Sequence, residues 1–186
     1  MGKATIVVAA VLLATVSGCA QAGSDGGREA GDDIPIPGQE WALKDGRVTS
    51  AEYGTAMGRF VSCIRDAGYP VSEPVLSPAD NLTLIYEVAP SGAPETYNNA
   101  VQSCNLSHLS MVEPTFVEAQ PQVMDEPLRR AVGDCLRRQG VAVTAEERNL
   151  REFARSAKDE TRVVDCVTAQ WPRVYPALPA EVPLRF

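Results

Sequence analysis

Apolar residues recur every three or four positions in four segments between Thr49 and Trp171, and this spacing predicts four amphipathic helices. The first segment opens on a capping-box pattern from Thr49 to Glu52 and ends before Gly68. The other three helices are expected over residues 94–109, over residues 125–139 with Asp125 as the cap, and over residues 144–171, with a capping box from Thr144 to Glu147 and a break near Lys158.

The pattern changes between the first two predicted helices. Residues 82–88 are aliphatic, aromatic and β-branched, and turn-forming residues stand on both sides, which predicts a strand. Residues 69–72 are expected to pair with it as a hairpin. A short strand over residues 141–143 is expected at the equivalent place after the third helix. The predicted fold class is therefore α+β: a small, mainly helical, disulfide-bonded domain.

Four of the five cysteines lie on the predicted helices in a repeated arrangement. Residues 60–71 align without gaps on residues 132–143, with a cysteine, an aliphatic residue, an arginine and a glycine at matching positions. Residues 100–104 align on residues 162–166 in the same way. We interpret the domain as two related helix–(short hairpin)–helix units, one over about 48–111 and one over about 124–171.

If each unit closes on itself, Cys63 pairs with Cys104 and Cys135 pairs with Cys166. Four cysteines allow three connectivities, so the sequence leaves the pairing open. Four buried free thiols are the alternative, which export from the cytoplasm would disfavour.

Residues 1–18 have the composition of a signal peptide. Lys3 precedes an uncharged apolar run over residues 4–16, which is shorter than the roughly 20 apolar residues that a membrane-spanning helix needs. The run leads into Val16-Ser17-Gly18-Cys19 and then into polar sequence.

These four residues resemble the lipobox of bacterial type II signal peptides, in which an aliphatic and two small residues precede a cysteine. The resemblance implies cleavage before Cys19, a diacylglycerol on its thiol, and an anchor on the extracytoplasmic face of the cell membrane. Lipidation would also explain the odd number of cysteines. The alternative is an ordinary cleaved leader with Cys19 as a spare thiol. The mature domain is similar to uncharacterised lipoproteins of GC-rich Gram-positive bacteria, a resemblance that implies no activity.

Residues 19–38 are expected to be the lipidated cysteine and a flexible tether, because Gly, Asp, Ser and Ala predominate and no aromatic residue is present. A tether of about 19 residues would span roughly 25 Å. The folded domain is expected over residues 39–171. Residues 172–186 are rich in proline and predict an extended strap, which either lies on the domain's own core or docks a partner through Trp171, Tyr175 and Phe186.

Several kinds of chemistry lack support in the sequence. A net charge of −7 with only short arginine pairs disfavours nucleic-acid binding. His108 is the only histidine and falls on the apolar face of a predicted helix, so we interpret it as a core or boundary residue rather than a catalytic base. Neither a Cys-x-x-Cys motif nor a group of metal ligands is present, so no redox role, metal or cofactor is expected.

Pairs of acidic residues remain, at the expected starts of helices, where they complement the helix dipole. These pairs are Asp125-Glu126, Glu146-Glu147 and Asp159-Glu160. The sequence favours a lipid-anchored binding or interaction module of the cell envelope, not an enzyme, with the membrane and an unidentified envelope protein as partners. The alternatives are a carboxylate-dependent hydrolase acting on glycans and a carrier of a small apolar ligand.

Overall fold

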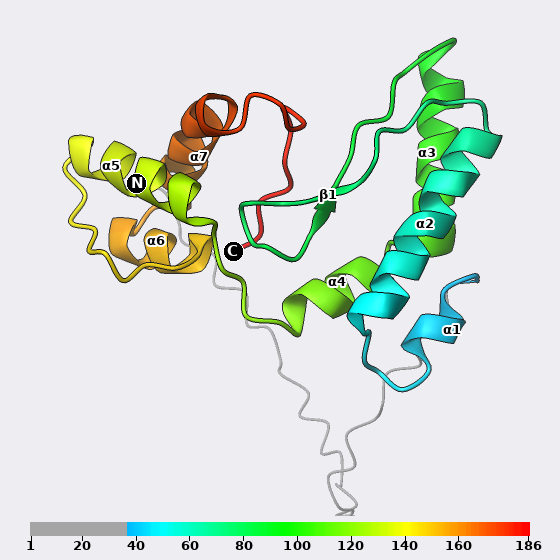
Figure 1. The fold of residues 1–186 in the computed structure, drawn as a ribbon, viewed down its shortest axis with the longest axis horizontal. Helices are drawn as coiled ribbons and strands as arrows, with labels where there is room; N and C mark the ends of the chain where they lie inside the picture. The colour runs from blue at the N-terminus through cyan, green and yellow to red at the C-terminus, as the bar shows by residue number, and fades with distance from the viewer. Residues whose placement is uncertain (1–36) are drawn as a thin grey trace, which may run out of the picture. The chain divides into compact units, whose positions relative to one another are not determined.

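The computed structural model describes residues 37–186 (Figure 1). The signal peptide, Cys19 and nearly all of the expected tether lie outside the described residues. Within the described range the elements are α1 (Glu40–Leu43), α2 (Ser50–Asp66), β1 (Val75–Leu76), β2 (Leu84–Ile85), α3 (Pro94–His108), α4 (Val112–Glu118), α5 (Glu126–Arg138), α6 (Leu150–Ala157) and α7 (Glu160–Val174). This confirms the mainly helical α+β class. No helix in this part of the chain is long and apolar enough to cross a bilayer.

The first unit is built on α2 and α3, which lie side by side (Figure 1). The predicted capping box is confirmed, because the Thr49 hydroxyl oxygen accepts from the Glu52 amide at 3.2 Å and the Glu52 carboxylate accepts from the Thr49 amide at 2.9 Å. The apolar stripe of α2 faces one hydrophobic cluster that also includes residues of α4. Its fully or nearly fully buried members on α2 are Tyr53, Ala56, Met57, Phe60, Val61 and Ile64.

Gln39, near the start of the folded domain, is fully buried, and the sequence pattern does not predict this. The Gln39 side-chain amide donates to the Leu106 carbonyl at 2.6 Å and to the Ser110 hydroxyl at 2.8 Å, and its oxygen accepts from the Met111 and Val112 amides at 3.0 and 3.1 Å. One side chain therefore satisfies backbone groups at the end of α3 and the start of α4. Gln39 therefore joins the end of α3 to the start of α4.

The predicted strand is present but shorter than expected. Only Leu84–Ile85 pairs regularly, with Val75–Leu76, and a single further bridge joins Val71 to Val88. The bridge confirms the expected pairing with residues 69–72. Alternation along this segment sends even-numbered residues toward the first cluster and Ile85 toward a second one, so the hairpin packs on both.

The second unit is built on α5 and α7, with α6 packed on α7. Its cluster includes the fully buried Leu128, Val132, Leu136 and Val163. The predicted break near Lys158 is confirmed, because Lys158 ends α6 with a φ of +54° and Asp159 caps α7.

The helix predicted to begin at Thr144 is wrong in its start, since α6 begins at Leu150 with Asn149 as the cap. Glu147 does accept hydrogen bonds from the Thr144 amide and hydroxyl. However, the carbonyls of Ala145 and Arg148 accept from the Arg129 side chain and from the Met124 amide, both in a different segment. Because these carbonyls bind distant groups, they do not accept the hydrogen bonds of an α-helix, and residues 144–148 are irregular.

The strand expected over residues 141–143 is also wrong. The Val141 amide bonds to the Leu136 carbonyl and the Val143 amide to the Val141 carbonyl, so the segment turns on itself and has no neighbouring strand. A strand needs a partner to satisfy its backbone, and the second unit has no segment equivalent to residues 82–88.

The ends of α2 and α5 nevertheless match each other closely. Gly68 and Gly140 follow these helices with φ of +91° and +80°, a conformation that favours glycine. The next amide bonds back to the helix in both cases, from Tyr69 to Ile64 at 3.1 Å and from Val141 to Leu136 at 3.0 Å. The aligned sequences thus form the same helix-ending motif in the two units.

A turn at the tip of the hairpin connects the two units. The Asp80 carboxylate accepts from the amides of Leu82 and Thr83, both at 2.9 Å, and shapes the turn. The Asp80 carbonyl then accepts from the Val123 amide at 3.1 Å, ahead of α5. Asn81, at a φ of +56°, donates its side-chain amide to the Val123 carbonyl at 2.9 Å.

Candidate functional site

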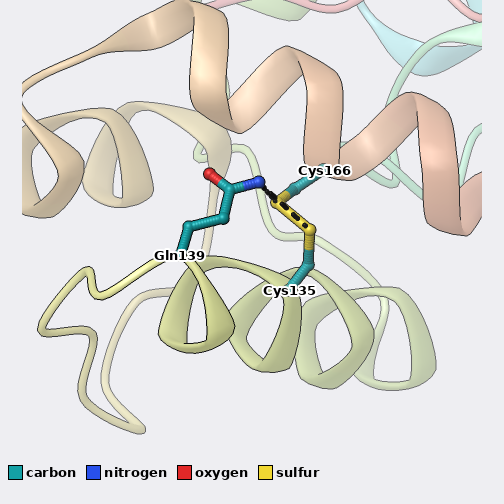
Figure 2. The surroundings of a disulfide bond; sticks show 3 residues. All are labelled: Cys135, Gln139 and Cys166. Carbon is teal, nitrogen blue, oxygen red and sulfur yellow. Dashed lines mark hydrogen bonds between the residues drawn. A yellow bond between two sulfur atoms is a disulfide. The ribbon is translucent and has the colours of Figure 1, made fainter.

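The four cysteines of the domain form the two disulfides that the unit interpretation anticipates. Cys63 is bonded to Cys104 and Cys135 to Cys166, which joins α2 to α3 and α5 to α7. Cys166 is fully buried and Cys135 is 9% exposed. The Gln139 amide nitrogen lies 3.3 Å from the Cys166 sulfur and points at the bond (Figure 2). This enclosure indicates a structural cross-link between helices.

His108 lies in the last turn of α3, half-buried, with its Nδ1 enclosed and without a hydrogen-bond partner in the described part of the chain. Burial lowers the pKa of the imidazole, and the neighbouring Arg59 guanidinium lowers it further. The ring is therefore neutral at pH 7, in keeping with its interpretation as a boundary residue.

The three aromatic residues proposed as partner anchors pack on their own domain. Trp171 is 1% exposed, and its indole N–H donates to the Pro179 carbonyl at 2.7 Å. Tyr175 and Phe186 are half-buried against the second cluster. An indole so enclosed is not offered to a partner in this conformation. For Tyr175 and Phe186, partner contact stays a prediction.

The strap itself begins later than expected. α7 continues through Pro172 to Val174, because a proline in the last turn removes only one hydrogen bond from a helix that is about to end. The Tyr175 hydroxyl then donates to the Asp125 carboxylate, which makes no capping bond to α5. Burial raises the pKa of Tyr175, and this hydrogen bond to Asp125 raises it further.

A polar network ties the far end of the strap to the first unit. Arg185 donates to the Glu113 carboxylate at 2.7 Å, and Glu113 accepts from the Tyr53 hydroxyl at 2.9 Å. The Tyr53 oxygen in turn accepts from the Leu84 amide at 2.8 Å. Burial raises the pKa of Tyr53, as does the Glu113 charge, so the phenol stays protonated and can donate.

A cavity of about 930 Å³ lies between the hairpin turn, the segment before α5 and the segment before α6. Its lining consists of Asn81, Val123, Met124, Asp125, Glu126, Arg129, Ala145, Glu146 and Arg148. Five of these nine side chains are charged, which differs from the apolar lining that a carrier of an apolar ligand would need.

The carboxylates around this cavity are engaged in structural contacts. Asp125 accepts from Tyr175, and the Glu126 carboxylate binds Arg129 and Arg130. Hydrogen bonds from Arg129 and then Arg130 lower the pKa of Glu126. A glycan hydrolase would need one carboxyl with a raised pKa as its general acid. The hydrolase alternative therefore stays a prediction without a residue assigned to that role.

A second cavity, of about 550 Å³, was not anticipated from the sequence. It lies beside the N-terminal turn of α6, and arginines from α6 and from the strap line it. The residues around it are Glu118, Gln120, Pro121, Gln122, Asn149, Arg151, Arg155, Arg185 and Phe186. The arginines come from two segments that are far apart in the chain, so no local motif could have identified them.

Among residues 37–186, no group of three or more histidine, cysteine or acidic side chains is arranged to hold a metal ion. Comparison of the chain with family models, with curated proteins and with solved structures gives no match.

Proposed function

We propose that the protein is an extracytoplasmic lipoprotein, anchored to the cell membrane through Cys19, whose disulfide-bonded domain serves as a binding or interaction module of the cell envelope. The observation that carries the proposal is the pairing of the cysteines. Of five cysteines, Cys63, Cys104, Cys135 and Cys166 bond to one another, and Cys19 is left over at the end of the apolar run.

Two disulfides are typical of a protein that folds in an oxidising compartment. A spare thiol is a liability there, and acylation would remove it. Lipid on Cys19 would hold the domain at the membrane surface through residues 20–38. The cross-linked helices give a rigid frame, which favours a role in presenting fixed surfaces and cavities to a ligand or partner.

Fractionation of cells that express the native protein and its Cys19→Ser variant tests the anchor. We expect the native protein to sediment with membranes and to incorporate labelled fatty acid, and the variant to do neither. The matched control is the double variant Cys63→Ser and Cys104→Ser, which removes other cysteines and should keep the lipid. Membrane association that persists in Cys19→Ser would overturn the proposal.

Crosslinking in intact cells, followed by mass spectrometry of the captured proteins, tests the interaction role. Reproducible capture of one envelope protein by the native chain supports an interaction module. The absence of any captured protein or bound small molecule, with the chain abundant at the membrane, would contradict the role as a binding module.

A further inference from the structure

The cavity of about 550 Å³ beside α6 concentrates positive charge in a chain that is acidic overall. Arg151 and Arg155 are one helical turn apart on α6, which places both on the same side of the helix. Arg185 reaches the cavity from the strap. The three arginines in the lining stand against two anionic groups, the side chain of Glu118 and the carboxylate of Phe186, the last residue of the sequence.

The three guanidinium groups differ in how far they are already engaged. Arg185 is paired with Glu113, although its Nε is buried without a partner within the described residues. Arg151 donates one hydrogen bond to a carboxylate oxygen of Phe186, the last residue of the sequence, at 2.9 Å. Arg155 is exposed and makes no ion pair or hydrogen bond within residues 37–186. Two guanidinium groups, those of Arg151 and Arg155, thus have most of their donors free to bind a ligand.

The rest of the lining suits an anion as well. Asn149 and Arg151 stand at the start of α6, which the Asn149 side chain caps by accepting from the Glu152 amide at 2.9 Å. Gln120 and Gln122 add neutral amide side chains. Asn149 donates to the Gln122 carbonyl at 3.2 Å and so fixes the loop that forms one wall. A cavity of this size falls within the range of sites that hold small ligands.

We propose that this cavity binds the phosphoryl group of a small ligand, with Arg151 and Arg155 as the direct contacts and Arg185 completing the positive wall. Guanidinium groups present paired N–H donors that match phosphate oxygens. The proposal rests on the proposed function as a binding module, for which it names a ligand class. The phosphoryl group could belong to a soluble phosphate ester or to a lipid headgroup.

The test uses the oxidised full chain carrying Cys19→Ser, so that binding is measured without an anchor. Titration calorimetry at low ionic strength with inorganic phosphate and with glycerol 3-phosphate measures the soluble source. Sedimentation with vesicles of phosphatidylglycerol, compared with vesicles of phosphatidylcholine, measures the headgroup source. We expect Arg155→Gln and Arg151→Gln each to weaken binding about tenfold, as the loss of a charged hydrogen bond implies.

The matched control is Arg138→Gln, which removes the same charge from an exposed position on α5 outside the cavity. Binding of glycerol 3-phosphate that falls in the two cavity variants and not in Arg138→Gln supports a soluble ligand. Vesicle binding alone, with the same dependence on the variants, supports a headgroup.

No binding of either probe, or equal losses in all three variants, overturns the inference. The binding experiment uses a chain without the lipid anchor. A negative binding result therefore says nothing against the anchor, which the fractionation experiment tests separately.

Discussion

The guanidinium of Arg185 lies 2.7 Å from the carboxylate of Glu113, which stands 72 positions earlier in the chain. Glu113 is also the acceptor for the buried Tyr53 hydroxyl, so the strap is bonded into a network of the first unit. Leu178, Val182, Leu184 and Phe186 pack on the second cluster. The strap therefore contacts both units and is part of the fold, which agrees with one of the two interpretations of the sequence.

Replacing Arg185 with Gln should destabilise the protein, because Glu113 would lose its charged partner in a half-buried site. We expect a loss of about 1–2 kcal/mol in the free energy of unfolding. For a protein of this size, Tm should fall by about 2–8 °C, measured by circular dichroism. Arg173→Gln is the control, since Arg173 is exposed in the last turn of α7 and should leave Tm unchanged. Equal Tm values for the two variants would show that the ion pair contributes nothing.

Gln39→Ala should destabilise the protein more strongly. The substitution removes four hydrogen bonds and strands the Val112 amide in the core. The expected loss is about 2–4 kcal/mol, measured by denaturant unfolding. Gln102→Ala, at an exposed position of α3, is the control and should be neutral or slightly stabilising. A Gln39→Ala variant as stable as this control would contradict the role assigned to the buried amide.

The two disulfides should stabilise the protein by similar amounts, because their loops separate cysteines by 41 and 31 residues. The chain-entropy relation gives about 4 kcal/mol for each. We expect comparable losses of stability when Cys63 and Cys104, or Cys135 and Cys166, are replaced by Ala in pairs. Chemical denaturation of the oxidised proteins measures this, with Cys19→Ser as the neutral control. If the removal of one disulfide left the free energy of unfolding unchanged, the expected stabilisation by that disulfide would be refuted.

Glu147 should make the protein less stable in acid. Burial acts to raise the pKa of this carboxyl, but hydrogen bonds from Ser156 and from Thr144 outweigh it, so the pKa lies below 4.5. A folded-state pKa below that of the unfolded chain gives stability that is complete at neutral pH. That stability is lost as the pH falls below about 4.5 and through the folded pKa.

We therefore expect Glu147→Gln to lower the unfolding free energy at pH 7 by about 1–3 kcal/mol and to narrow its difference from the native protein at pH 3. Thermal melts at the two pH values measure both effects. Glu146→Gln is the adjacent exposed control and should change neither. A Glu147→Gln deficit of equal size at pH 3 and pH 7 would rule out the ionised carboxylate as its source.

Local patterns predicted the helices well where the chain's own neighbours supply the hydrogen bonds. The capping box at Thr49 and the helix-ending glycines at positions 68 and 140 involve residues within one or two turns. The identities of these residues were therefore enough to predict where the helices begin and end. The Thr144–Glu147 pattern had the same residues and formed similar bonds, yet no helix followed it. Backbone carbonyls at Ala145 and Arg148 are bound by distant groups, and no local pattern records that.

The candidate sites also divide into those that local sequence patterns predicted and those that depend on distant residues. The four domain cysteines and their repeated spacing were visible in the sequence, and closure of each unit on itself predicted the pairing that the structure has. The basic cavity was not visible, because Arg185 lies 30 residues beyond Arg155 and meets it only through the path of the strap. Gln39 was equally hidden, since a single polar residue beside a polar tether gives no sign of burial.

By itself, the sequence determined the helical stripes, the hairpin and the expectation of a lipidated Cys19, since each depends on residue type and short-range spacing. It left three cysteine connectivities open, and the structure selected one of them. Only the tertiary structure decided that Trp171 is buried, that the strap joins both units, and that three arginines line one cavity. These depend on which distant surfaces meet, and that is set by the packing of the two clusters against the hairpin and the strap.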